Sequence, residues 1–491
     1  MPTVVYFLFA LALLIGGYVV YSRVAEKLFG PDHNRATPAE TMADGVDYIK
    51  LPTWKIFMIQ LLNIAGVGPV FGPILGALYG PSALLWIVFG AILAGGIHDY
   101  FSGMLSVRYH GKSLPDVIGF TLGNVFKQIM RVFSVVLLVL VGVVFVSAPA
   151  GLLAKLTPEW MNFNFWMIVI FMYYFLATVL PIDVIIARLY PLFGAVLIVM
   201  AVGVSGGLIL GGYAFYSWPL DQVTNVFSNQ HPNKLPMWPL MFVTIACGAL
   251  SGFHATQSPL MSRCVPNERC GRAVFYGSMI AEGIIALIWA TAGMTFYDSA
   301  QSLLAALGPK TNAALVVDQV CRTLLGPVGG VLAILGVVAL PVTSGDTAFR
   351  AARLVIADVT SMSQSKPLSR LLIAVPLFLV GAAISQVDFG IIWRYFGWAN
   401  QSLATIVLWA AAAYVVKRGG LHWLVSLPAT FMTAVVITYL CNQKIGFGLD
   451  YTLSVYFGAG AAAVALLAFL ASMGWFRRNT LIQLPQPGQA N

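Results

Sequence analysis

Five ionisable side chains stand inside long apolar stretches of the sequence: His98, Asp99, His254, Glu282 and Asp346. Burying such a group in an apolar environment is costly, so each is a candidate for carrying a proton. Imidazole titrates near physiological pH, and His254 could also pair with the carboxylate of a bound solute. We rank His254 and Asp346 highest, because both lie among helix-breaking residues. The alternative is a structural role, in which His98 and Asp99, for example, pair with a nearby basic group.

Glycine and proline residues interrupt three of the apolar stretches, at residues 63–73, 248–259 and 340–347. Inside a helix each proline costs about 3 kcal/mol and each glycine about 1 kcal/mol. Irregular backbone within a membrane is tolerated only where it lines a cavity or is buried in protein. The start of a half-helix attracts an anion and its end attracts a cation. For a single break, close helix packing is the favoured explanation, but two breaks at matching positions, both with polar residues beside them, favour a binding site.

The composition defines the environment in which these residues act. Of 491 residues, 59% are hydrophobic and 9% are charged, against about 25% charged residues in soluble domains. This excludes a soluble globule and predicts an all-α polytopic membrane protein whose partner is the lipid bilayer. The net charge of +9 comes from scattered Lys and Arg residues, so we expect no nucleic-acid partner. Five cysteines without CxxC spacing predict no disulfide framework, and a metal site at Cys264 and Cys270 is disfavoured.

The apolar runs are long enough to predict about thirteen membrane-spanning helices. They are residues 3–22, 54–79, 83–107, 127–154, 162–180, 189–213, 238–261, 273–297, 326–349, 369–386, 388–416, 421–440 and 450–474. The stretch 300–325 is expected to be a helix on the membrane surface. No cleavage motif follows the first run, which we therefore interpret as a retained helix.

The distribution of basic residues predicts the orientation of the chain. With residues 23–53 placed in the cytoplasm, 21 of the 27 Lys and Arg residues lie at inside ends, as the positive-inside rule requires. The N-terminus then faces out and the C-terminal tail, residues 475–491, faces in. The loop 214–237 is extracytoplasmic.

The positions of the first two breaks predict an internal repeat. One lies in the second span and the other in the seventh, five spans later. Because five is odd, equivalent halves have opposite orientations in the membrane, which is the arrangement of two inverted five-helix repeats. The repeats would cover residues 54–213 and 238–416, preceded by one helix in residues 1–22 and followed by two helices in residues 421–474.

Several runs of residues resemble the signature of the carbon starvation protein family, CstA: residues 35–39, 44–48, 64–75, 95–100 and 251–254. The resemblance implies a transporter of the bacterial or archaeal inner membrane, within the amino acid–polyamine–organocation superfamily, with a LeuT-like core. Family members are described as peptide transporters induced by carbon starvation, and some as proton-coupled pyruvate symporters. This chain is much shorter than the long members and differs from them at residues 60–63 and 255–259. The solute is therefore left open.

A LeuT-like core implies a cation site near the first break. Its ligands would be the carbonyl groups of Leu62, Ala65 and Leu340 and the hydroxyl groups of Thr343 and Ser344. Oxygen ligands suit a hard cation such as sodium. Equally, these hydroxyls could bond back to their own helix. The coupling ion is thus sodium or a proton, and no other cofactor is expected.

The solute site is expected between the two breaks. We expect a carboxylate to meet N–H groups around Gly66 and Gly68 and around Ser251, Gly252 and His254. Polar side chains would complete the pocket: Gln60, Asn63, Thr256, Gln257 and Ser258. The leading hypothesis is a secondary active importer of a small carboxylate or short peptide, not an enzyme; no GxxxxGK[ST] loop for ATP occurs. A channel is the second hypothesis and a membrane enzyme the third, and the oligomeric state is left open.

Overall fold

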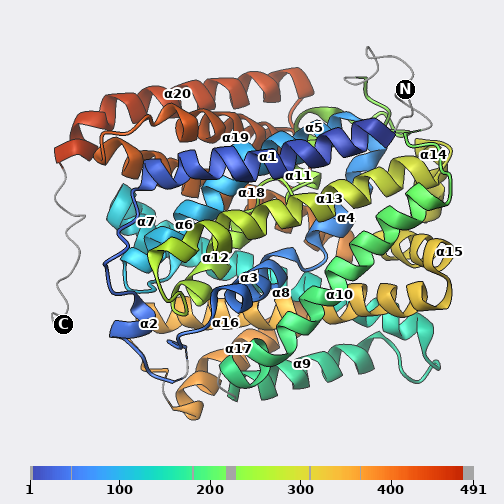
Figure 1. The fold of residues 1–491 in the computed structure, drawn as a ribbon, viewed down its shortest axis with the longest axis horizontal. Helices are drawn as coiled ribbons and strands as arrows, with labels where there is room; N and C mark the ends of the chain where they lie inside the picture. The colour runs from blue at the N-terminus through green and yellow to red at the C-terminus, as the bar shows by residue number, and fades with distance from the viewer. Residues whose placement is uncertain are drawn as a thin grey trace.

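The computed structural model describes residues 4–45, 47–179, 182–216, 228–308, 311–364 and 366–478, except the side chains of residues 156 and 182–191. Over these residues the regular structure is entirely helical (Figure 1). Parts of three predicted regions lie outside the described residues: the extreme N-terminus, the middle of the loop 214–237, and the tail beyond Arg478.

The first half of the chain forms ten α-helices and two short segments of other helical types. They are α1 (Val4–Phe29), α2 (Pro38–Thr41), α3 (Thr53–Ala65), α4 (Gly68–Gly76), the 3₁₀ turn η1 (Ala77–Tyr79), α5 (Ser82–Phe89), the π-helix η2 (Gly90–Gly95), α6 (Gly96–Arg108), α7 (Leu114–Leu122), α8 (Asn124–Leu156), α9 (Phe163–Val179) and α10 (Ile182–Leu210).

The second half repeats this mixture of long and interrupted helices. Its elements are α11 (Met237–Thr244), α12 (Gly252–Ser262), the 3₁₀ turn η4 (Glu268–Cys270), the π-helix η5 (Arg272–Tyr276), α13 (Gly277–Phe296), α14 (Ala300–Leu307), α15 (Ala313–Ile334), the π-helix η6 (Leu335–Ala339), α16 (Leu340–Thr360), α17 (Pro367–Ile384), α18 (Phe389–Lys417), α19 (Trp423–Asn442) and α20 (Tyr451–Arg478).

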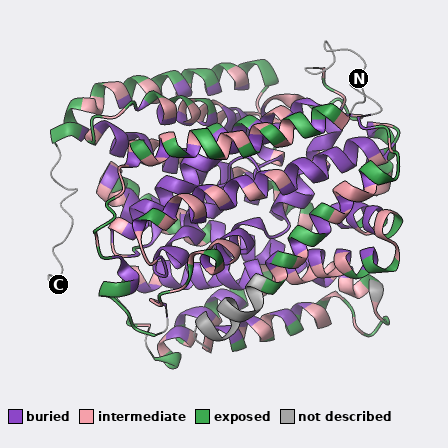
Figure 2. Cartoon of the chain, viewed as in Figure 1, coloured by how far each residue is buried: buried purple, intermediate pink, exposed green. Residues whose placement is uncertain are grey.

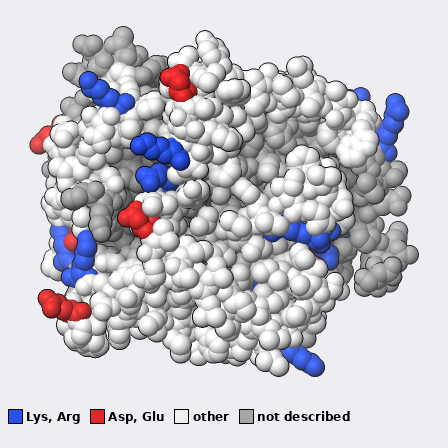
Figure 3. Space-filling model, turned by 180° about the vertical axis from the view of Figure 1, so that it is seen from behind, with Lys and Arg blue, Asp and Glu red and all other residues white. Residues whose placement is uncertain are grey.

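The long helices run along the longest axis of the molecule, and α1 begins at the opposite end from the end of α20 (Figure 1). Helices α12 and α13 are largely buried, whereas α1, α9 and α20 present exposed residues at the periphery (Figure 2). Charged side chains on the face in Figure 3 gather toward the two ends and leave an uncharged middle. This is the surface expected of a protein that spans a bilayer.

Ten described helices are long and apolar enough to cross a membrane, and the bent pair α3–α4 makes eleven. The other two predicted spans correspond to α9, which has 17 residues, and to the interrupted pair α11–α12. The count of thirteen therefore stays a prediction. The stretch 300–325 forms α14 and the first part of α15, and non-helical backbone at Gly326 separates this part from the rest of α15, which continues through η6 into α16. Its position at the membrane surface stays a prediction.

Two of the three predicted breaks are present, and the third prediction was wrong. Between α3 and α4 the chain bends by 46°, and Gly66 there has φ = +48°, a conformation that favours glycine. The second interruption covers residues 245–251, earlier than predicted, so His254 lies in the first turn of α12. Residues 340–347 are continuous helix in α16, and Pro341 lies just after the π-helix η6, with which α16 is continuous. Asp346 therefore does not lie in a break.

Candidate functional site

The irregular segment 245–251, which joins α11 to α12, is held by side chains from neighbouring helices. Asn400 of α18 accepts hydrogen bonds through Oδ1 from the N–H of Phe253 (2.7 Å) and from the hydroxyl of Ser251 (3.1 Å). The next residue, Gln401, donates to the carbonyl of Phe242 (3.0 Å) in α11. Side chains of α18 therefore provide hydrogen-bond partners for peptide groups of both half-helices, as buried backbone requires.

A close approach between helices brings α6 against this segment. A β-carbon on Gly95 would collide with the carbonyl oxygen of Ala249, so glycine is required at this contact. Gly95 ends the π-helix η2, and Tyr276 of η5 donates its hydroxyl to the carbonyl of Ile92 within η2 (2.8 Å). π-Helical turns are frequent at functional sites. Here the turn directs the start of α6, which carries His98 and Asp99, toward α12.

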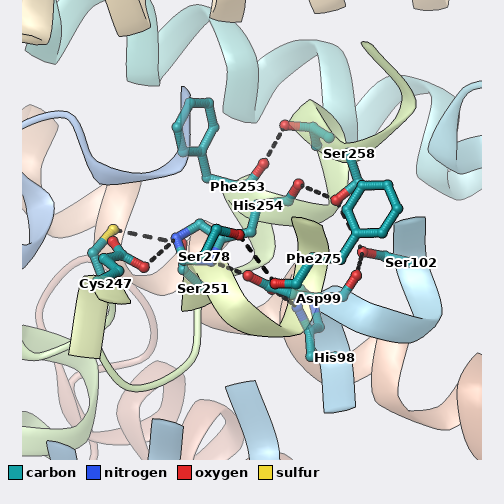
Figure 4. A network of polar contacts seen from close by, with 12 residues as sticks. His98, Asp99, Ser102, Cys247, Ser251, Phe253, His254, Ser258, Phe275 and Ser278 are labelled. Atoms are coloured by element: carbon teal, nitrogen blue, oxygen red, sulfur yellow. Dashed lines mark hydrogen bonds and ion pairs between the residues drawn. The ribbon is translucent and has the colours of Figure 1, made fainter. Parts of the chain in front are cut away.

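Four of the five predicted ionisable residues meet in one fully buried group, the carboxylate–histidine cluster (Figure 4). Asp99 lies between two imidazoles, with Oδ1 2.7 Å from Nδ1 of His98 and Oδ2 2.9 Å from Nδ1 of His254. The other ring nitrogen of His254, Nε2, lies 3.3 Å from Oε2 of Glu282 in α13. The fifth candidate, Asp346, is buried in α16 and takes no part in these contacts. Asp99 thus pairs with two imidazoles, not with a basic group near the cytoplasmic end as the structural alternative supposed.

Cys247 of the irregular segment lies beside this cluster (Figure 4). One ligand atom each from Cys247, His254 and Glu282 lies within 4.8 Å of the others. Cys264 and Cys270, the pair considered from the sequence, do not join a comparable group among the described residues. Sequence reasoning missed Cys247, because its distance from His254 depends on how the chain turns between α11 and α12.

A row of serines ties α12 to α6. The hydroxyl groups of Ser102 and Ser258 are 3.2 Å apart, and Ser262 donates to the carbonyl of Gly103 (2.9 Å). Ser258 also donates to the carbonyl of His254 (3.0 Å). Within α12, Thr256 donates to the carbonyl of Phe253 (2.6 Å). Of the predicted solute-binding residues, Ser258 and Thr256 thus already use their hydroxyl hydrogens within the protein.

Two predicted solute-binding amides before the first break have no hydrogen-bond partner among the described residues. Gln60 and Asn63 of α3 are fully buried, and neither the oxygen nor the nitrogen of either amide is bonded. The amide oxygen of Gln257 in α12 is likewise unbonded. Native proteins leave few buried polar groups unsatisfied, and each such group calls for an explanation.

Aromatic rings from α8 and α12 enclose the first break. Phe145 lies against Gly66, where a β-carbon would come within 2.6 Å of its ring, and packs edge-to-face on Phe253 with ring centroids 5.9 Å apart. The hydroxyl of Tyr174 in α9 is buried without a partner and lies against Gly345 of α16. Aromatic walls with a few polar groups are typical of small-molecule sites. No spacing signal pointed to Phe145 or Tyr174 before the fold was known.

Two pairs form among the predicted cation ligands. Ser344 of α16 donates its hydroxyl to the carbonyl of Leu62 in α3, at 3.0 Å. Thr343 donates to the carbonyl of Leu340 in its own helix, at 2.8 Å. Helices α3 and α16 therefore pack as the cation prediction requires, whereas Thr343 follows the alternative of bonding back to its helix, at i−3.

A small cavity lies beside α12. It is lined by Ser113, Leu114, Ser134, Thr256, Pro259, Leu260, Arg263, Ala351, Leu354 and Val355. Thr256 belongs to the predicted solute site, and Arg263 follows the last residue of α12. The cavity therefore extends from the predicted site toward the predicted cytoplasmic end, between α7, α8, α12 and α16.

The family described as Carbon starvation protein CstA matches residues 2–163, 154–324 and 297–439. The chain belongs to this family. A CstA relative in Haemophilus influenzae, named "Uncharacterized membrane protein", is 44% identical over 61% of this chain and 92% of its own length. The "Peptide transporter CstA" of Campylobacter jejuni is 28% identical over 89% of this chain and 79% of its own.

Solved structures confirm the LeuT-like fold. Mhp1, a nucleobase-cation-symport-1 family transporter in a closed conformation with bromovinylhydantoin bound, superimposes with a TM-score of 0.54 at 12% identity. The match covers 91% of this chain and 96% of that chain. Together with the CstA relatives, it supports a multi-pass membrane transporter and points away from an enzyme.

Proposed function

We propose that this CstA-family chain is a proton-coupled importer of a small carboxylate or short peptide. The observation that carries the proposal is the carboxylate–histidine cluster, where one imidazole, that of His254, contacts the carboxylates of both Asp99 and Glu282. All three side chains are fully buried. Intramembrane groups of this kind are typical of proton relays in transporters.

The charge balance of the cluster depends on its protons. Two ionised carboxylates beside neutral imidazoles would leave negative charge uncompensated in a low-dielectric interior, at high cost. A proton on His254 lets both ring nitrogens donate, one to each carboxylate, and a proton on His98 completes the balance at Asp99. Proton occupancy therefore stabilises the geometry in which α6, α12 and α13 are held together.

Movement of α12 offers the link between proton and solute. His254 follows the irregular segment directly, so a shift of this half-helix changes its distance from Asp99 and Glu282. The same half-helix packs against α3 and carries Gln257, whose amide oxygen is also buried without a partner. Rocking of one helix group against another around a central site is the usual means of alternating access in this fold.

The solute contacts are assigned to the groups left without partners. We place the solute at the amides of Gln60, Asn63 and Gln257. The N–H group of Phe253 already bonds to Asn400, and that of His254 bonds to the carbonyl of Ser251. These two N–H groups are therefore not assigned to the anion. The region around Gly66 and Gly68 remains a candidate for the carboxylate.

The proposal is tested in proteoliposomes with labelled pyruvate and a labelled dipeptide, under separate pH and sodium gradients. An inward proton gradient should drive accumulation of at least one of them, and exchange of labelled for unlabelled solute should distinguish a carrier from a channel. His254→Gln should abolish accumulation while leaving exchange, because the solute site is retained. His33→Gln, an exposed control, should behave like the parent. Accumulation by His254→Gln at the parental level would contradict the proposal.

Sodium is the second candidate for the coupling ion, favoured by the contact between Ser344 and the carbonyl of Leu62. In that case a sodium gradient drives uptake in the experiment above, and Ser344→Ala removes the sodium dependence. If the proton proposal holds, Ser344→Ala costs only one hydrogen bond, about 1 kcal/mol of stability, and the response to the pH gradient persists.

A further inference from the structure

Four arginines gather at the predicted cytoplasmic end of the molecule, near the cavity beside α12. They come from the end of α12 and from α16 and α17, and we call them the arginine cluster: Arg263, Arg350, Arg353 and Arg370. None is more than 5% exposed. The buried carboxylate among them is that of Asp47, from the loop between α2 and α3.

Among the side chains that the structure describes, the cluster holds more positive than negative charge. Asp47 is its buried acidic partner. Asp358, which acts on Arg263, is partly exposed, and Asp44, which acts on Arg370, is exposed. Burial alone would raise the pKa of Asp47, but the charges of the four arginines hold it below its ordinary value. Buried charges without counter-charges are costly, so the excess calls for an anion.

The guanidinium groups also have hydrogen-bonding capacity to spare. Arg350 lies 3.7 Å from Asp47, too far for a hydrogen bond. Its Nε and Nη1 atoms are buried without a hydrogen-bond partner among the described residues, and so is Nη2 of Arg353. The remaining bonds of these two arginines go to neutral oxygens of Ala177 and Gln364. A guanidinium binds carboxylates best through paired N–H groups, which neither arginine achieves here.

The cluster adjoins the route by which a solute would leave. Arg263 lines the cavity together with Thr256, a residue of the predicted solute site. Residues 351, 354 and 355 of α16 line the same cavity, and Arg350 and Arg353 are their neighbours along that helix. A carboxylate that enters this cavity from Thr256 therefore meets Arg263, and Arg350 and Arg353 adjoin the residues of α16 that line the same cavity.

We propose that the arginine cluster is a second anion-binding site, which takes the carboxylate of the solute on the cytoplasmic side in exchange for Asp47. This proposal rests on the proposed function for the identity of the solute, but not for the binding itself. A carboxylate that bonds to Arg350 and Arg353 replaces a loose ion pair with direct hydrogen bonds. It also releases Asp47 and the loop between α2 and α3 that carries it.

The test is thermal unfolding of the purified full chain in detergent, with sodium acetate as the carboxylate and acetamide as its neutral counterpart. Ionic strength is held constant with sodium chloride. Acetate, and not acetamide, should raise the Tm. Arg353→Gln should raise the acetate concentration needed for the same rise in Tm about tenfold, which corresponds to the loss of one charge-assisted hydrogen bond. Arg477→Gln, which removes an exposed arginine of α20, should leave it unchanged.

Asp47→Asn provides an independent measurement that does not require an arginine to be replaced. Loss of the carboxylate among the arginines should lower the Tm. Acetate should restore the Tm at lower concentrations than those that raise the Tm of the parent. A parental response to acetate in Arg353→Gln would overturn the proposal, as would an Asp47→Asn variant that acetate does not rescue. If Asn63→Ala, and not Arg353→Gln, abolished the rise in Tm with acetate, acetate would bind at the predicted solute site, and the proposal would also be overturned.

The two proposals fail separately. If parental proteoliposomes accumulate no carboxylate or peptide, the proposed function is wrong, whereas the acetate response can still be measured. If they do accumulate solute and Arg353→Gln leaves both the acetate response and the release of solute unchanged, only the second site is wrong.

Discussion

The two helix breaks look alike in the sequence but differ in how their polar groups are used. Beside the first, between α3 and α4, the amides of Gln60 and Asn63 are buried without partners. Beside the second, between α11 and α12, Asn400 and His254 are bonded to several neighbours. The first break therefore leaves two whole amides free for a ligand from outside the chain. At the second break the oxygen of Asn400 and Nδ1 of His254 are bonded within the chain, and only single atoms, such as the amide oxygen of Gln257, are left unbonded.

This difference explains why two breaks serve better than one. A site that binds a solute must leave polar groups unsatisfied until the solute arrives, at a cost of about 1–3 kcal/mol for each buried group. A site that holds a proton needs its bases close together at all times. By separating the tasks, the fold leaves α3 open to the solute and gives the start of α12 a fixed set of partners.

The largest effect should come from Asp99, because its carboxylate contacts both imidazoles. Asp99→Asn removes the charge that balances two protons, and we expect accumulation of solute to fall by at least about two orders of magnitude, since breaking a buried charge pair costs about 3–5 kcal/mol. Glu282→Gln, which loses one contact with His254, should have a smaller effect. Uptake in proteoliposomes under a pH gradient measures both. Equal, minor losses would show that the cluster is structural.

A pair of asparagines tests the comparison between the breaks directly. Asn63 and Asn400 are both fully buried, but only Asn400 accepts hydrogen bonds. We expect Asn400→Ala to lower the free energy of unfolding by about 1–3 kcal/mol, because Phe253 and Ser251 lose their acceptor. Asn63→Ala should leave stability unchanged and raise the KM for uptake about tenfold. Thermal unfolding and transport kinetics of both variants separate the two roles, and a reversed pattern would contradict them.

Much of the fold could be predicted, because membrane spans leave a strong signal in the sequence. The first break was also predictable, since only glycine adopts the backbone of Gly66 without strain. The predicted break at 340–347 was wrong because proline and glycine have other uses. Pro341 closely follows the π-helix η6 within a continuous helix, and Gly345 makes room for Tyr174.

The residues of the site could be listed from the sequence, but not their connections. His98, Asp99, His254 and Glu282 were each recognisable as costly to bury, although they lie up to 184 residues apart along the chain. Their meeting depends on the contact of Gly95 with Ala249, which no local pattern reveals. Asn400 and Gln401 were missed, yet two consecutive amides inside an apolar span were a signal that could have been used.

The smallest expected effect concerns the pH dependence of stability at Asp47, away from both breaks. The charges of the arginine cluster hold the pKa of Asp47 below its ordinary value of 3.8, although burial opposes them. A carboxyl whose pKa is lowered by folding stabilises the protein above the unfolded value, and this contribution is lost as the pH falls through the lower, folded value. Between pH 5 and about 3, Tm should therefore fall in the parent and fall less in Asp47→Asn. Asp298→Asn, an exposed control, should follow the parent. If Asp47→Asn also follows the parent, the carboxylate of Asp47 is not the counter-charge of the arginines. The carboxylate–histidine cluster, whose charges balance within the chain, and the arginine cluster, which needs an added anion, would then no longer differ in this respect.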